Sequence, residues 1–256
     1  MKRNRFAGWM VRLMLVGAVA LVPAMLSAAD RPAKEDAVKV EMFDGIEKGD
    51  IEVKLIPKDS TVGTLLITNK TKKPLKVKLP EAFAGVPVLA QIGGGGVGGG
   101  GGGQGMGMGG GMGGGMGGGG MGGGGGFFAV PAEKTGKVKL PGVCLEHGKP
   151  DPRPHMKYEV KPIEEFTTKP GVKELVGMLG KGQVDQRSAQ AAAWNLNCDM
   201  SWQQLAAKQI KRANGARYPY FAPVELARGV QAANVAVAQA REEQEQSPGE
   251  SLSQTQ

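Results

Sequence analysis

Between residues 93 and 126 the chain is almost pure glycine, with 27 glycines in 34 positions, five methionines and no charged side chain. Glycine loses more conformational freedom on folding than any other residue, and this segment has little apolar surface whose burial could offset that loss. The sequence therefore predicts a disordered insert over 93–126. Because strand-like sequence stands on both sides of it, we expect a long loop inside one sheet domain rather than a linker between two domains.

The N-terminal segment has the pattern of a secretory signal peptide. Its first twelve residues hold four cations and no acid, an apolar run over 13–24 follows, and small residues occupy 27–29. This pattern predicts cleavage before Asp30 and a protein that is secreted, periplasmic or part of the cell envelope. No later apolar run is long enough for a membrane helix, so we expect no stable membrane span after cleavage.

The charge balance argues against a nucleic-acid partner. The formal net charge is +8, but four of the cations lie in the signal segment, which leaves +4 on the rest of the chain. Lysines dominate 34–78, yet they alternate with apolar residues and few aromatic residues stand between them. A nucleic-acid surface needs clustered cations, with aromatic side chains where single strands are bound. We therefore interpret these lysines as the solvated face of a sheet.

Apolar residues alternate with polar ones on both sides of the glycine tract. Over 51–55 and 75–79 every second residue is apolar, and Glu or Lys stands between them. A period of two is typical of strands with one buried face. Strand character resumes at 127–130 and again at 137–145. About seven short strands separated by turns predict an immunoglobulin-like β-sandwich.

From Pro162 onward the apolar period becomes helical. A stripe at i, i+3, i+4 and i+7 begins at Val172, and Asp185 is placed to cap a second helix. Ser201 and Gln204 have the spacing of a capping box at the start of a third. We expect a small all-α domain of three to four helices, which makes the fold class α+β.

These patterns define the predicted domain organisation. Its parts are a signal peptide at 1–29, a sandwich at 30–148 with its insert at 93–126, a Pro-rich linker at 149–161, a helical domain at 162–242 and a disordered tail at 243–256.

The chain has two cysteines, Cys144 and Cys198. In an exported protein such a pair is a candidate disulfide. It would close a loop of about fifty residues and contribute on the order of 2–4 kcal/mol. The sequence does not show whether the two Cβ atoms come close enough for this bond.

A second interpretation joins Cys144 to Gln190. Cys144 stands in a predicted strand, and Gln190 lies in the predicted helix that follows Asp185, with Ala two positions later and Trp194 four positions later. Over about 140–200 this resembles the thioester domains of bacterial surface adhesins, in which a strand Cys is acylated by the Gln of a Thr-Gln-x-Ala-(Ile/Val)-Trp motif. Here Ala189 and Ala193 stand in place of the Thr and the β-branched residue. The resemblance implies covalent adhesion by a thioester, whereas an Ala-rich amphipathic helix with a core Trp explains the same residues without chemistry.

Metal binding is a further possibility. Soft thioethers in a mobile chain suit Cu(I), and the tract supplies five of them, at Met106, Met108, Met112, Met116 and Met121. Cys144 and His147, with His155 and Cys198, could supply four zinc ligands, although the second closely spaced pair of a typical zinc site is missing. Neither pattern excludes ordinary surface residues.

Taken together, the sequence predicts an exported, non-enzymatic protein of the cell envelope or its surroundings, which binds or adheres to a surface component. The alternatives are copper handling through the methionine tract, and a purely structural envelope protein with a Cys144–Cys198 disulfide.

Overall fold

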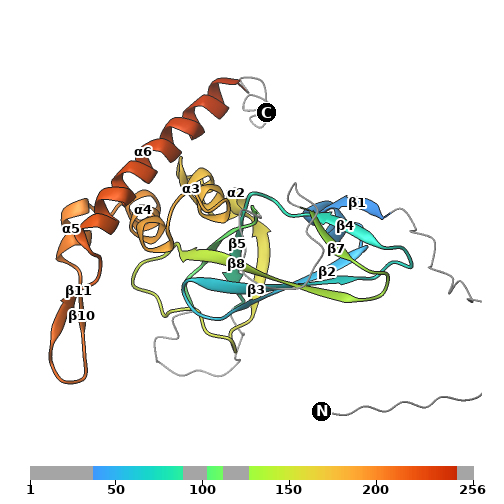
Figure 1. Ribbon diagram of the computed structural model, residues 1–256, viewed down its shortest axis with the longest axis horizontal. Helices are drawn as coiled ribbons and strands as arrows, with labels where there is room; N and C mark the ends of the chain where they lie inside the picture. The colour runs from blue at the N-terminus through green and yellow to red at the C-terminus, as the bar shows by residue number, and fades with distance from the viewer. Residues whose placement is uncertain (1–36, 89–102, 112–126, 247–256) are drawn as a thin grey trace, which may run out of the picture. The chain divides into compact units, whose positions relative to one another are not determined.

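The computed structural model describes residues 37–88, 103–111 and 127–246 (Figure 1). The predicted signal peptide lies outside these residues. The strands are β1 (Val38–Glu41), β2 (Ile51–Pro57), β3 (Val62–Asn69), β4 (Leu75–Lys78), β5 (Ala82–Pro87), β6 (Met106–Gly109), β7 (Phe127–Val130), β8 (Thr135–Cys144), β9 (Tyr158–Pro162), β10 (Gln209–Lys211) and β11 (Arg217–Pro219). The helices are α1 (Met42–Glu47), α2 (Ile163–Phe166), α3 (Val172–Gly180), α4 (Gln186–Cys198), α5 (Trp202–Ala207) and α6 (Pro223–Gln246).

Six strands form a closed antiparallel barrel in the order β2-β3-β8-β6-β5-β9. The prediction of an immunoglobulin-like sandwich is therefore wrong. A period of two shows only that each strand has one buried face, which holds for a barrel as well as for a sandwich. Closure depends on two strands from segments that we expected to be irregular. These are β6 from the glycine tract and β9 from the predicted linker.

Strand β6 has the sequence Met-Gly-Met-Gly, and its two kinds of residue face opposite ways. Met106 and Met108 are fully buried in the barrel core, together with Leu55, Leu65 and other apolar residues. Gly109 lies against the last turn of α3, where an added Cβ would stand 2.5 Å from the Cα of Gly180. The expected disordered insert is thus wrong for 103–111, and the rest of the tract lies outside the described residues.

A second, three-stranded sheet has the order β1-β4-β7. β4 pairs with β1 in parallel and with β7 antiparallel, and both pairings place lysines on the exposed face. Lys39 lies opposite Lys76 there, while Lys78 forms an ion pair with Glu41 at 2.9 Å. This face agrees with the solvated lysines expected from the sequence.

The helices share a core with the barrel instead of forming a separate domain. Leu175, Val176 and Leu179 of α3 pack in one cluster with Val143 of β8 and Ala84 of β5. The linker expected at 149–161 contains most of β9, which pairs with β5. The described residues accordingly belong to one compact unit.

Local helix signals in the sequence are confirmed. The Asp185 side chain accepts a hydrogen bond from Ser188 N at the start of α4, and Ser201 and Gln204 form the capping box of α5. Helix α6 runs to Gln246, so the tail expected from 243 begins as helix. Among the helices that the structure describes, none is both long and apolar enough to cross a bilayer.

Candidate functional site

The structure brings Cys144 and Gln190 into direct contact at the end of β8. The backbone N–H of Cys144 donates to Gln190 Oε1 at 2.8 Å, and Gln190 Nε2 donates to the Cys144 carbonyl at 2.8 Å. Both side chains are buried, at 1% and 3% exposure. Because both ends of the amide have partners, these hydrogen bonds offset the cost of removing the Gln190 group from water.

The contact forms where β8 loses its neighbour on one side. The pairing of β3 with β8 ends at Val62 opposite Pro141, whereas β6 continues along the other edge to Cys144. Helix α4 covers the open edge with amide side chains. Gln186 donates to Gly142 O at 3.2 Å, and Asn197 donates to Leu145 O at 2.7 Å. A strand edge left open here would carry unpaired polar groups, which α4 satisfies.

The spacing of these amides follows from helix geometry. Residues 186, 190 and 197 lie on one face of a 3.6-residue helix. The residues around Gln190 are alanines, and Ala189, Ala191, Ala192 and Ala193 are all fully buried. Their small side chains let α4 approach β8 closely enough for side-chain amides to reach its backbone.

Trp194 lies one turn beyond Gln190 and is 5% exposed. Its ring packs edge-on against His147 at 4.8 Å between centroids, and also contacts Tyr220 and Phe221. The indole Nε1–H is buried and has no hydrogen-bond partner among the described residues. Trp194 and Phe221 thus pack in one apolar cluster with Cys144.

Lys208 covers this cluster on its outer side. Its ammonium lies 5.2 Å from the Trp194 ring and 2.8 Å from Nε2 of His147. Since an ammonium can only donate, His147 Nε2 accepts and the ring is neutral. Burial and the neighbouring Lys208 charge lower the pKa of His147, and burial also lowers the pKa of Lys208.

Neither cysteine forms a disulfide in the structure. Cys198 Sγ donates to Leu145 O at 3.0 Å and accepts from His147 N at 3.3 Å, so it lies beside the residues that follow Cys144. Burial raises the thiol pKa of both cysteines. At neutral pH each is therefore a protonated thiol, and the Cys144–Cys198 disulfide stays a prediction.

Two of the expected metal ligands have a structural place. Met106 and Met108 fill the barrel core, while Met112, Met116 and Met121 lie outside the described residues, so copper binding stays a prediction. His155 is exposed. Within the three described ranges, no group of three or more His, Cys, Asp or Glu residues could hold a metal ion.

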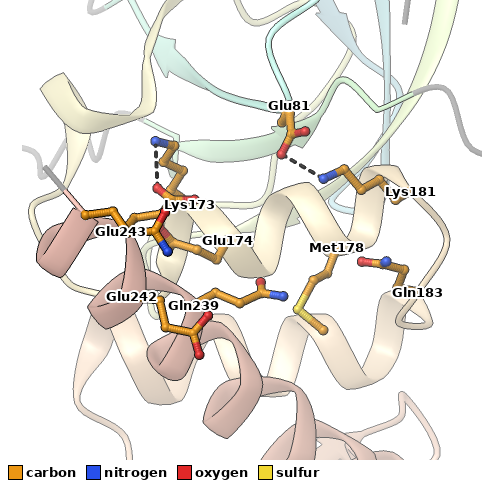
Figure 2. Close-up of a pocket in the computed structure, with 10 residues that line it drawn as sticks. Glu81, Lys173, Glu174, Met178, Lys181, Gln183, Gln239, Glu242 and Glu243 are labelled. Carbon is orange, nitrogen blue, oxygen red and sulfur yellow. Dashed lines mark hydrogen bonds and ion pairs between the residues drawn. The ribbon is translucent and has the colours of Figure 1, made fainter. Parts of the chain in front are cut away.

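A separate pocket of about 340 Å³ lies where α3 meets the C-terminal part of α6 (Figure 2). Two lysines partly neutralise its carboxylates: Lys181 pairs with Glu81 at 2.8 Å and Lys173 with Glu243 at 3.4 Å. Burial raises the pKa of Glu174, and nearby Glu243 adds to this shift. This pocket was not predicted, because in the sequence the acidic end of α6 resembles a solvated tail. One of these ion pairs joins α3 to α6, and the other joins the end of α3 to the residue before β5.

Searches of protein-family models, of curated proteins and of solved structures find no match to this chain. The candidate site is therefore the contact between Cys144 and Gln190, which the sequence resemblance implied and the structure contains.

The sequence patterns did not predict strand β6, although a signal for it exists. Met106 and Met108 are the only methionines of the tract spaced two apart, as a strand with one buried face requires.

Proposed function

We propose that this chain is an exported, non-enzymatic binding protein of the cell envelope or its surroundings, and that Cys144 and Gln190 can close to an internal thioester. The observation that carries the proposal is the reciprocal pair of 2.8 Å hydrogen bonds between Cys144 and Gln190. These bonds hold the Gln190 carboxamide beside the residue that would attack it. A donor on Oε1 also polarises the carbonyl toward a nucleophile.

The proposed chemistry consists of two acyl transfers, one that forms the thioester and one that joins the chain to its partner. The Cys144 sulfur attacks Cδ of Gln190, the Sγ–Cδ bond forms, and Nε2 leaves as ammonia with the thiol proton. An amine on a partner surface then attacks Cδ and forms an amide. Cys144 leaves as a thiolate and takes up the proton that the amine releases. One partner is captured per chain, which is adhesion and not turnover.

The surroundings set the rate of closure. Because burial raises the pKa of the Cys144 thiol, little thiolate exists at neutral pH. Closure should therefore be slow at neutral pH, and its rate should increase as the pH rises. Trp194 and its aromatic neighbours exclude water from the bond that forms. Small amines are expected to open it more readily than bulky ones, since Cys144 and Gln190 are both buried.

The test is the intact mass of the mature protein, with and without methylamine and a thiol-specific reagent. A thioester appears as the loss of one ammonia, with Cys144 unreactive until methylamine adds to Gln190. The variant Gln190→Ala serves as the matched control and retains a reactive thiol under denaturing conditions.

Two other masses contradict the thioester. Loss of two hydrogens that a reductant restores identifies the Cys144–Cys198 disulfide. This result would favour the alternative of a structural envelope protein. Two free thiols at full mass identify Gln190 solely as the group that covers the edge of β8.

A further inference from the structure

The hairpin formed by β10 and β11 is separate from both cores of the molecule. Figure 1 shows it projecting as a two-stranded ribbon from the region where α5 and the start of α6 lie. The residues of both strands are exposed, and each pairs only with the other strand. An isolated pair of strands is marginally stable at best. Its sequence is therefore not explained by burial.

The turn is nevertheless well defined. Arg212 N donates to Ala216 O at 2.9 Å, and Gly215 takes the left-handed conformation at φ 83° that closes the bend. The Asn214 side chain accepts from Ala216 N at 3.1 Å. At its base, Tyr220 N donates to Lys208 O at 2.8 Å. The hairpin is thus held in one shape before it meets any partner.

The two faces of the hairpin differ. Ile210 pairs with Tyr218 across the strands, and these side chains are 43% and 51% exposed. The Arg212 guanidinium lies 5.4 Å from the Tyr218 ring on the same face. Lys211 pairs with Arg217. Like charges directly opposite one another destabilise a strand pair, so this placement weakens the hairpin itself.

The charge here is of one sign. No acidic residue occurs between 200 and 224, whereas four cations do, at Lys208, Lys211, Arg212 and Arg217. Within the described part of the chain, Lys211, Arg212 and Arg217 form no ion pair, although many other lysines do. Cations that lack acidic neighbours and repel each other fit a polyanionic partner.

The apolar pair Ile210 and Tyr218 favours an anionic lipid surface over a nucleic acid as the partner of the hairpin. Ile210 is aliphatic and has no π-face for a base, whereas Ile and Tyr beside Arg and Lys are the side chains that suit a lipid interface. The uncharged tip of Ala, Asn, Gly and Ala at 213–216 lets the turn approach headgroups without burying charge. Arginine and lysine stems can reach back to the phosphates.

We infer that the β10–β11 hairpin docks on a membrane surface rich in anionic phospholipids, with Ile210 and Tyr218 in the interface and Lys211, Arg212 and Arg217 on the headgroups. The inference rests on the proposed export and surface binding for the setting in which such a membrane is met. It does not depend on the thioester.

The test is co-sedimentation of the chain from Asp30 onward with vesicles of phosphatidylcholine, with or without phosphatidylglycerol. We expect binding only with the anionic lipid, and weaker binding as salt rises. The triple variant K211Q/R212Q/R217Q should reduce the partition coefficient on the order of 100-fold, at about fivefold per cation. The double variant I210S/Y218S should weaken binding but keep its dependence on salt.

A matched control removes the same charge elsewhere. K72Q/K73Q/K76Q neutralises three exposed lysines of the β3–β4 turn and β4, and it should bind like the parent chain. Equal losses in the two triple variants would show attraction by net charge alone and overturn the inference. Binding to neutral vesicles, or tighter binding to an oligo-dT of equal phosphate concentration, would also overturn it. Because the mass test reads Cys144 and Gln190, the two proposals can fail separately.

Discussion

Residue scale

A single amide on α4 completes the hydrogen bonding of a strand in the barrel. Gln190 satisfies both backbone groups of Cys144, which no strand reaches on that edge. An amide can do this because it carries a donor and an acceptor on one short planar group, as the backbone does. Its role in the folded chain is thus local and measurable as long as Gln190 keeps its amide, because closure to a thioester would remove the Nε2 donor.

Replacing Gln190 with Leu should destabilise the fold by about 2–4 kcal/mol, because a buried N–H and a buried C=O lose their partners. The free energy of unfolding from urea denaturation measures this loss. Gln239→Leu, at an exposed position of α6, is the control and should change stability little. A loss below about 1 kcal/mol for Gln190→Leu would mean that water replaces the amide.

His147 predicts a pH dependence below neutrality. Its folded pKa lies below the ordinary value of 6.5, because burial and Lys208 disfavour a second positive charge. As pH falls through 6.5, the unfolded chain binds a proton that the folded chain does not, so stability decreases. His147→Gln should flatten the fall in urea midpoint between pH 8 and 5.5, since Gln still offers Lys208 an acceptor.

The chain has one other histidine, which supplies the control. His155→Gln, at an exposed site, should leave the slope of midpoint against pH as in the parent. If His147→Gln also leaves it unchanged, His147 is not the source of the slope and the prediction is wrong; Glu174 cannot be its source, because burial raises the pKa of that carboxyl and makes the folded chain more stable as pH falls.

Element scale

Strand β6 shows why glycine can belong to a core. Its methionines fill the barrel, and its glycines make room for α3 on the outside. Gly109 and Gly180 approach backbone to backbone, and no side chain could move aside to admit a Cβ there. The ordering entropy of glycine is offset here by two buried methionines and by the barrel closure that the strand provides.

Gly→Ala substitutions at Gly109 and at Gly177 should change the free energy of unfolding in opposite directions. Gly109→Ala should destabilise the protein by several kcal/mol, because its Cβ would stand 2.5 Å from the backbone of Gly180. Gly177→Ala, on α3 itself, meets nothing closer than 3.7 Å and should stabilise by about 0.5–1 kcal/mol through helix propensity. Urea denaturation of both variants measures the signs. A neutral Gly109→Ala would show that β6 does not hold this position in solution.

Whole-molecule scale

The helices share an apolar cluster with strands β5 and β8 of the barrel, so the barrel and the helices should unfold together. The cluster that joins α3 to β5 and β8 leaves no apolar face on either part to be solvated separately. Small single units of this kind usually unfold in one transition. Two independent domains, as the sequence patterns suggested, would give two.

Leu65→Ala, a fully buried change in β3, tests this coupling. It should lower stability by about 2–5 kcal/mol and shift the fluorescence transition of Trp194 and Trp202 as much as the circular dichroism transition. Both tryptophans lie in helices, so an unshifted fluorescence curve would show that the helices unfold independently.

The sequence alone determined the local structure of this protein. Alternation of side chains and the caps at Asp185 and Ser201 follow from spacing and short-range hydrogen bonding, whereas the pairing of Cys144 with Gln190 was implied by the resemblance to thioester domains. The tertiary structure decided which strands pair. Four residues of the glycine tract and five near the predicted linker close a barrel, because pairing there depends on long-range contacts with β5, β8 and α3 that carry no local signature. The composition of a segment indicates how much conformational entropy it loses when it becomes ordered. The free energy that it gains from pairing and burial depends on its neighbours in the fold.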